Sequence, residues 1–531
     1  MPNRFWVGGT ATWDALSTAN WSATSGGVAG ASVPGSADTA FFDANSGVNT
    51  VTLAYAPTLG GLNLGNFPGT LNFNSNVISL VFNGATIFAG GSTATLIGTP
   101  TINCTYSGSV GTRTISIGAL GENNAVNVNI TAGTDIISLI TTNGAYKTVN
   151  FTGFSGSLSL GASILVFGDL ILSPGMTVNA SSSSVSFRAT SGTQQITTNG
   201  KTLDFPVTQN TPGATVQLQD NLTMGSTRTF TLTAGTLDLA SRTLSTGIFS
   251  SSNSNVRSIA FGTGNITVTG NAATVMTIDN GTNFSYTGAP DFYFTYSGST
   301  GTRNILGSQP TNGGTESNAV NVYVTAGLDA VAIGGANRVY KTIDLTGFSG
   351  TFNALSRQVY GNFTLSATTT VGAGSGFSFN ATSGTQLVTL NGVTLLFNLA
   401  INAPGATVRF QDALTLGASN TLTLTNGTVQ LKNGVTSTVG AFATSGTSQK
   451  FLQSTTPGSQ ATLSQASGTV TASNLTIRDI NAVGGATWNA FVDQGNVDAG
   501  NNDGWDFGIS PVIGGAEYTY QLRSFTQPRR F

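Results

Sequence analysis

A block of about 190 residues occurs twice in this chain of 531 residues, and the duplication restricts the possible folds more than any other feature. The stretch YKTVNFTGFSG begins at Tyr146 and returns as YKTIDLTGFSG at Tyr340, 194 residues later. TYSGSVGTR begins at Thr105 and returns as TYSGSTGTR at Thr295, 190 residues later. The small drift in offset places short insertions between the copies, where loops tolerate them. Because an enzyme normally needs its catalytic site once, we interpret the copied stretches as building elements of the fold.

Short runs of alternating apolar and polar residues fill each block. Between residues 222 and 249 the runs TFTLT and TLDL alternate with period two and are separated by Ala-Gly. The copy that begins at Leu414 has TLTLT and TVQL, separated by Asn-Gly. This alternation predicts half-buried strands, and breaks that contain glycine mark the corners between them. No window has a helical period with a convincing cap, so we expect an all-β protein.

Three all-β architectures use strands this short. Immunoglobulin-like sandwiches have a core Trp or a Cys pair in each unit of roughly 100 residues, but no Trp lies between Trp21 and Trp488. A meander of hairpins suits the Asn-Gly pair within Thr425–Thr428. An elongated parallel β-solenoid (β-helix) suits the whole chain better, because its coils of roughly 20 to 25 residues carry short strands between Gly or Asn corners. About 20 such coils, each about 4.8 Å high, predict a rod on the order of 100 Å long.

All tryptophans lie near the two ends of the chain. An open solenoid leaves its core and its backbone groups uncovered at each end, and bulky aromatic residues can cover them. We therefore predict capped ends formed by Trp6, Trp13, Trp21, Trp488 and Trp505. The predicted organisation is an N-terminal cap at 1–60, a first solenoid block at 61–290, a second block at 291–470, a C-terminal cap coil at 471–510 and a tail at 511–531.

Composition excludes several kinds of site. The chain has no histidine and one cysteine, Cys104, which rules out Ser-His-Asp triads, His-based zinc sites and an internal disulfide framework. Only 8% of the residues are charged and the net charge is −2, so we expect neither a nucleic-acid partner nor membrane insertion. The start MPNRFWVGGTATW lacks the apolar stretch of a secretory signal. No cofactor is expected.

Acidic residues give little support for catalysis. Glycoside hydrolysis usually needs two carboxylates on either side of the scissile bond. Several acids recur at matched positions of the two blocks, and we interpret these as corner residues that accept hydrogen bonds from backbone N–H groups. The matched pairs are Glu122 and Glu316, Asp135 and Asp329, and Asp220 and Asp412. The unmatched Asp169, Asp279 and Asp291 do not cluster in the sequence, so we expect no enzymatic activity.

Two further groups of residues are candidate ligand sites. Asp493, Asp498 and Asp503 lie in DQGNVDAGNNDGWD and supply oxygen ligands of the kind that Ca²⁺ prefers, although turns beside a capping Trp explain this stretch without an ion. Exposed tyrosines would stack on sugars, and packed tyrosines would not. The tyrosine candidates are Tyr106, Tyr146, Tyr296, Tyr323, Tyr340 and Tyr360. The unchanged Tyr-Lys pairs at Tyr146–Lys147 and Tyr340–Lys341 are candidates for contact with a partner.

The last residues are rich in aromatic and basic side chains. After Glu517 the chain has no acid. This composition fits an attachment segment and equally a solvated basic tail. The residues concerned are Tyr518, Tyr520, Arg523, Phe525, Arg529, Arg530 and Phe531.

The two ends also resemble known proteins. FWVGGTATWDALSTANWS from Phe5, followed by SVPGSADTAFF from Ser32, resembles the opening segment of long β-helical bacterial surface proteins of the autotransporter-adhesin kind. NLTIRDINAVGGATWNAF from Asn474 is similar to the final coil of bacterial and tailed-phage β-helix proteins. The 24 residues after Phe507 are too few for a translocator barrel, which needs at least about eight strands of about 10 residues. A phage virion protein folds in the host cytoplasm and needs neither an export signal nor a translocator barrel. It therefore agrees better with the absence of both.

These observations predict a non-enzymatic structural and adhesive protein of a phage virion, as a tail fibre, a spike or a capsid decoration. It would assemble in the host cytoplasm, form a homo-oligomer, and bind other virion proteins and a host surface glycan. One alternative is a β-helical adhesin at the bacterial cell surface. The other is a phage polysaccharide depolymerase.

Overall fold

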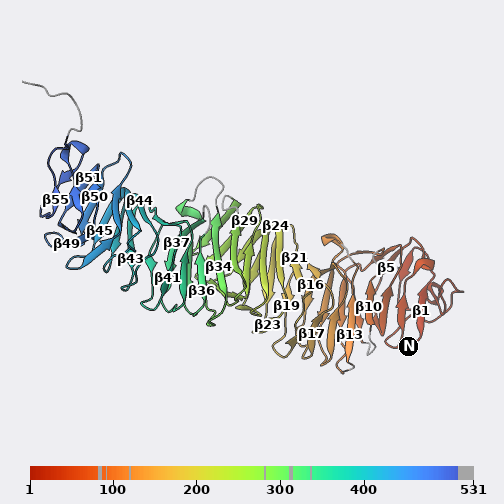
Figure 1. Ribbon diagram of the computed structural model, residues 1–531. Coiled ribbons are helices and arrows are strands. Elements are labelled where there is room, and N and C mark those ends of the chain that lie inside the picture. The colour runs from red at the N-terminus through yellow and green to blue at the C-terminus, as the bar shows by residue number, and fades with distance from the viewer. Residues whose placement is uncertain are drawn as a thin grey trace, which may run out of the picture.

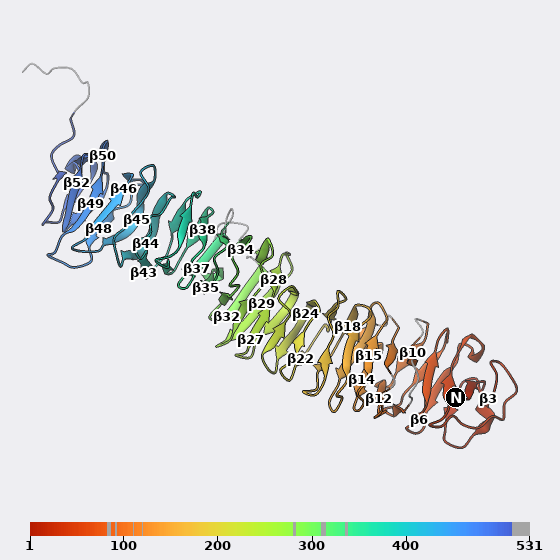
Figure 2. The ribbon, with the colours of Figure 1, turned by 60° about the horizontal axis from the view of Figure 1, so that its bottom comes forward.

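The computed structural model is all-β, with 3% of residues in helices and 50% in strands, and forms a parallel β-solenoid of about 20 turns. Figures 1 and 2 show an elongated rod along which the chain advances steadily from the N-terminal end to the C-terminal end. The predicted fold class is therefore confirmed. The structure describes residues 1–81, 86–90, 93–109, 111–118, 121–279, 283–309, 315–334 and 338–511. The longest strands are β16 (Gly144–Asn150), β24 (Val207–Leu218), β26 (Thr229–Asp238), β34 (Thr302–Gln309), β37 (Arg338–Asp344), β44 (Leu399–Phe410) and β45 (Thr421–Leu431).

Each coil stacks on the next in parallel register. In β24 and β26, Val207 lies opposite Phe230 and Val216 lies opposite Leu237. Because side chains alternate between the two faces of a strand, like residues form columns that run along the rod, apolar inside and polar outside. One cluster of buried residues extends from Trp6 to Ala490. The solenoid body is thus held by a single continuous core.

The opening sequence motif illustrates this alternation. Val149 in β16 and Ile343 in β37 are fully buried, whereas Asn150 and Asp344 beside them are only half-buried. Apolar exchanges between the blocks thus fall on the inner face. In the turn that follows, Gly153 has φ +90, and a Cβ there would lie 2.6 Å from the carbonyl oxygen of Thr131. Only glycine fits both the conformation and the space.

The Asn-Gly pair of the second block does not form a hairpin. Asn426 and Gly427 lie inside β45, which pairs in parallel with β44, β47 (Ala441–Thr444) and β48 (Lys450–Ser454). Gly427 has φ +89, a left-handed conformation that turns the strand around a corner of the coil. The same dipeptide that favours a two-residue hairpin therefore serves as a solenoid corner, because the chain continues into the next parallel rung.

Both ends of the core are rich in aromatic rings. The Trp21 ring centroid lies 5.2 Å from that of Trp6 and 5.0 Å from that of Trp13, and all three side chains are fully buried. The strands β1 (Asn3–Trp6) and β3 (Trp21–Ser22) pair antiparallel, unlike the coils that follow. At the other end, the rings of Trp488 and Trp505 lie 5.0 Å apart. The capping role of these residues stays a prediction.

Among the described residues, the structure contains no helix with the length and apolar character of a membrane-spanning segment.

Candidate functional site

Three of the six candidate tyrosines belong to the interior. Tyr146 and Tyr340 are fully buried, and Tyr360 is 8% exposed. The Tyr340 hydroxyl donates a hydrogen bond to the carbonyl oxygen of Ile305 at 2.7 Å. These three tyrosines are therefore packed residues, the alternative to stacking on a sugar. In each of the two Tyr-Lys pairs, only the lysine side chain can contact a partner, because the tyrosine is buried. Lys147 is half-buried and Lys341 is exposed.

Tyr106 and Tyr296 support buried ion pairs. The Arg113 guanidinium lies 5.3 Å from the centroid of the Tyr106 ring and pairs with Asp135. Matched residues of the second block repeat the arrangement: Arg303 lies 5.2 Å from the Tyr296 ring, and its Nε and Nη2 donate to the Asp329 carboxylate at 2.6 and 2.9 Å. Asp135 and Asp329 therefore neutralise buried arginines, which corrects their interpretation as corner residues.

The remaining matched acids do hold corners. Asp220 accepts hydrogen bonds from the backbone N–H groups of Thr198 and Asn199, and Asp412 accepts from those of Leu390 and Asn391. Glu122 accepts from the N–H and hydroxyl of Thr190. Glu316 instead accepts from a side chain, the hydroxyl of Thr382, at 3.1 Å. The backbone interpretation is confirmed for Asp220, Asp412 and Glu122.

The sixth tyrosine, Tyr323, belongs to a stacked pair on the outside of the rod. Tyr293 in β33 (Asp291–Phe294) lies opposite Tyr323 in β35 (Val320–Val324). The ring centroids are 4.7 Å apart with an interplanar angle of 16°. Both side chains are half-buried, and their neighbours Phe292, Phe294, Val322 and Val324 fill the core. Sequence analysis missed Tyr293, although the alternation Asp-Phe-Tyr-Phe already placed it on the outer face.

Acidic and amide groups surround the tyrosine pair. Asn321 donates a hydrogen bond to Asp291 at 2.8 Å, and Asp344 lies opposite Tyr323 on the next coil. Burial, followed by the charges of Asp291 and Asp344, raises the pKa of Tyr293, and burial with the same two carboxylates raises the pKa of Tyr323 to about 12. The field at both hydroxyls is therefore negative. Such a surface suits a ligand that offers hydrogen-bond donors.

The first block has no such pair at the matched positions. The sequence offsets align Tyr293 with Asn103 and Tyr323 with Asn129, and there Asn129 donates to Asn103 at 2.8 Å. An asparagine ladder thus stands in one block where the other has stacked phenols. The tyrosine pair is a property of the second block and not of the repeat.

We expect Asp344→Asn to lower the pKa of Tyr323 from about 12 towards 10, because one of the charges that oppose phenolate formation is removed. Ultraviolet absorbance titration, with Tyr323→Phe as the difference control, measures this pKa. The folded-state pKa lies above the unfolded value of about 10, so the free energy of unfolding should fall as pH rises between about 10 and 12. An unchanged titration in Asp344→Asn would contradict the electrostatic contact.

The three candidate metal ligands accept hydrogen bonds near the C-terminal end, and Asp498 alone accepts them within its own turn. Asp493 accepts a hydrogen bond from the N–H of Ser510 at 2.9 Å, and Asp498 accepts one from Asn502 at 2.6 Å. Asp503 accepts from Gln460 at 2.8 Å. Within the described ranges, no group of three or more His, Cys, Asp or Glu side chains is placed to hold a metal ion. Whether turns or an ion account for this stretch stays a prediction.

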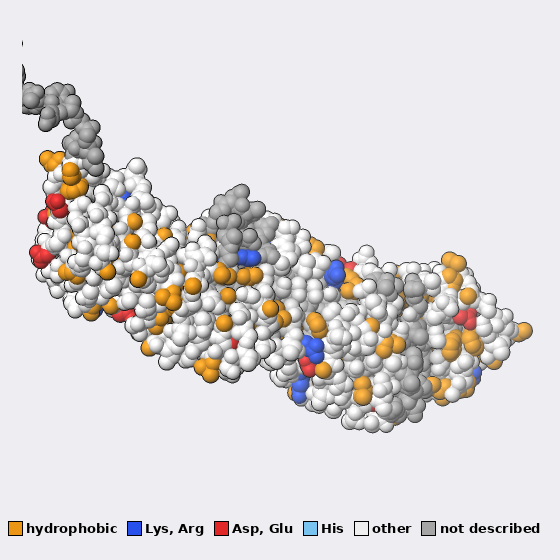
Figure 3. Space-filling model, in the orientation of Figure 1, with side chains coloured by type: hydrophobic (Ala, Val, Ile, Leu, Met, Phe, Trp, Pro, Cys, Tyr) orange, Lys and Arg blue, Asp and Glu red, His pale blue; other side chains and the backbone are white. Residues whose placement is uncertain are grey.

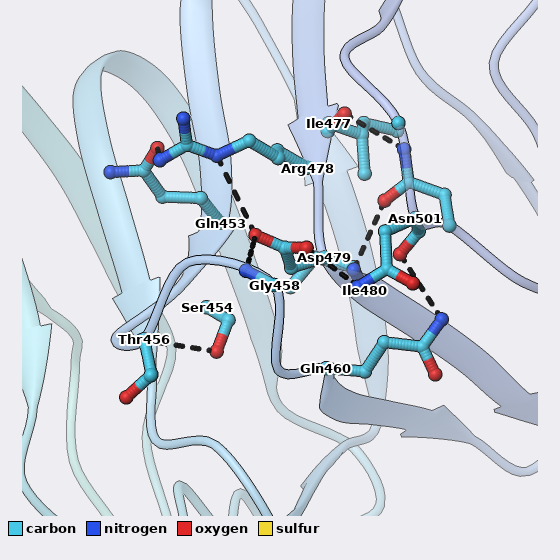
Figure 4. Close-up of polar contacts among 12 residues, drawn as sticks. Gln453, Ser454, Thr456, Gly458, Gln460, Ile477, Arg478, Asp479, Ile480 and Asn501 are labelled. Atoms are coloured by element: carbon cyan, nitrogen blue, oxygen red, sulfur yellow. Dashed lines mark hydrogen bonds and ion pairs between the residues drawn. The ribbon is translucent and has the colours of Figure 1, made fainter.

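A buried acid that sequence analysis did not single out fixes this end of the rod. Asp479 is 3% exposed and has φ +58. Its carboxylate accepts hydrogen bonds from the N–H of Gly458 at 3.0 Å and from Asn501 at 2.6 Å, and Arg478 Nε lies 3.6 Å from it (Figure 4). The network joins three successive coils and is structural, because Asp479 is occupied by its neighbours.

Of the unmatched acids Asp169, Asp279 and Asp291, the structure describes the contacts of two. Asp169 accepts a hydrogen bond from the N–H of Gln195 at 2.8 Å and so holds a corner. Asp291 belongs to the tyrosine pair. The side chain of Asp279 lies outside the described part of the structure. So do all the predicted tail residues: Tyr518, Tyr520, Arg523, Phe525, Arg529, Arg530 and Phe531.

No known protein family, curated protein or solved structure matches this chain. The chemistry that the surface offers is therefore the basis for assigning a function. That surface consists mainly of uncharged polar groups, with few charged side chains on the face shown in Figure 3. On it, the Tyr293–Tyr323 pair combines aromatic rings with two carboxylates and an amide.

Proposed function

We propose that this protein is a non-enzymatic structural and adhesive component of a phage virion, built as a rod that holds a host-binding surface away from the particle. The observation that carries the proposal is the large core cluster, whose described residues extend from Trp6 to Ala490. A continuous core and a continuous parallel ladder make the chain one stiff body, as a fibre, spike or decoration requires. Ordinary multidomain chains bend at linkers.

The low charge supports self-association. With only 8% charged residues, the faces of the rod repel their own copies little, so side-by-side packing into a homo-oligomer costs little electrostatic energy. The resemblance of the chain ends to β-helical surface and virion proteins supports the same assignment. The Tyr293–Tyr323 pair is the proposed contact with a neutral host glycan, since rings pack on sugar faces and carboxylates accept from sugar hydroxyls.

Immunogold electron microscopy tests the location. An antibody raised against the full chain is applied to particles from a phage lysate and to bacterial cells that carry the gene. We expect gold on the tails or capsids of particles and none on particles from a strain with the gene deleted. Gold on intact cells that release no particles would establish the surface adhesin instead. Release of reducing sugar from host capsule by the purified chain would establish the depolymerase.

A further inference from the structure

A groove runs along the rod in the first block. It consists of two depressions, of about 630 Å³ and about 510 Å³, that share Asn210 and Pro212. Its walls come from six rungs stacked in order: β16, β18 (Ile164–Val166), β21 (Val185–Phe187), β24, β26 and β29 (Arg257–Gly262). Five spacings of about 4.8 Å give the groove a length on the order of 24 Å. This length accommodates an extended chain of several units.

The lining of the groove is positive. It contains two arginines and no Asp or Glu; Arg257 is 1% exposed and donates to Ser251 and Asn255, so Arg188 is the cation of the lining that a ligand can reach. Arg188 is exposed, and in the described part of the structure it takes part in no ion pair. The acid beside the groove, Glu122, is bonded to the lining residue Thr190 and lies 3.8 Å from Lys147, which offsets its charge.

The floor and the rim differ in polarity. Leu165, Phe167 and Pro212 give apolar contact along the floor. Amide groups stand along the length of the groove, and Asn143 and Asn255 are exposed at its two ends. Apolar surface between hydrogen-bonding groups matches a sugar ring, which has apolar faces and polar edges. Arg188 adds the preference for negative charge.

We infer that this groove binds an acidic polysaccharide, with the chain lying along the rod and a sugar carboxylate paired with Arg188. The bidentate geometry of guanidinium suits a carboxylate. The repeat supplies a comparison: ATSGTQ begins at Ala189 and again at Ala381, so the second block has Asn380 where the first has Arg188. The exposed cation Arg188 is therefore specific to the first block, and the tyrosine pair to the second.

The inference goes beyond the proposed function, because binding of an acidic glycan does not depend on where the protein is displayed. Isothermal titration of the purified full chain with hexagalacturonate, and with maltohexaose as the neutral probe, tests it. We expect hexagalacturonate to bind, with weakening as salt rises, and maltohexaose to bind at least tenfold more weakly. Equal affinity for both would overturn the role of charge.

Variants locate the site. Arg188→Asn, which copies the second block, should weaken hexagalacturonate binding at least tenfold, whereas Arg188→Lys should weaken it less. Arg242 is exposed and lies outside the groove lining, so Arg242→Asn is the matched control and should bind as the parent does. Unchanged binding by Arg188→Asn, or equally tight binding of single-stranded oligothymidine, would overturn the inference. Immunogold results bear on the proposed function alone, so the two can fail separately.

Discussion

Asp329→Ala should lower the free energy of unfolding of the second block by about 3–5 kcal/mol, the largest loss we expect from removing a single carboxylate. Asp329 and Arg303 are both buried, and the carboxylate accepts from two guanidinium nitrogens. Without it, a charged guanidinium stays in the core beside the Tyr296 ring with no counter-ion. Because each coil contacts only its neighbours, hydrogen exchange should show lost protection around β34 and β36 (Ala330–Ile333) first.

Two further variants separate the charge from the packing. Arg303→Met combined with Asp329→Leu should recover most of the loss, because an apolar pair leaves no uncompensated charge in the core. Asp506→Ala removes an exposed carboxylate and should change stability by less than about 0.5 kcal/mol. If Asp329→Ala were as mild as Asp506→Ala, the buried pair would not contribute as argued.

Trp21→Ala should destabilise the N-terminal coils by about 3–5 kcal/mol and cause self-association. The Trp21 ring lies against three others, those of Trp6, Trp13 and Phe42, so its removal leaves a cavity that cannot easily collapse. If these rings close the end of the core, their loss exposes apolar surface and unpaired backbone to other molecules. Hydrogen exchange measures the local loss, and light scattering measures the association.

The comparison with Phe249→Ala tests the capping role itself. Phe249 is fully buried in the middle of the rod, packed 6.3 Å from the Phe230 ring. Its truncation should cost about as much stability and produce no greater association than the parent protein shows. Equal association by both variants would mean that Trp21 is an ordinary core residue.

The solenoid fold could be predicted from the sequence because the residues that indicate it act on the backbone near them. Alternation in TFTLT and TLDL, glycine at corners and the missing internal tryptophans are all readable along the chain. The outer positions of Asn150 and Asp344 follow from alternation as well. Alternation and corner glycines recur over about 20 turns, so a wrong assignment at one position does not change the predicted fold.

The candidate sites depended on neighbours from other coils, which spacing in the sequence does not show. Strict alternation would place Tyr146 on the outer face with Asn150, but the register of β16 shifts between Tyr146 and Val149, so that both residues are buried. Tyr293 and Tyr323 are 30 residues apart and meet only because β33 and β35 stack in register. The Arg303–Asp329 pair likewise joins two coils. The groove could not be predicted from the sequence, because its lining residues come from six stacked rungs.

The stacking also determines how the rod responds to force. Hydrogen bonds between coils run along the axis, so a pull on the two ends stretches each bond along its own direction and does not shear many bonds together. Coils should therefore peel away singly from an end. Leu244 lies opposite Leu222 on the next coil, 22 residues further along the chain, so each coil released would add about 75 Å of extended chain. A fibre of this construction lengthens in small steps under load, and the remaining coils stay folded.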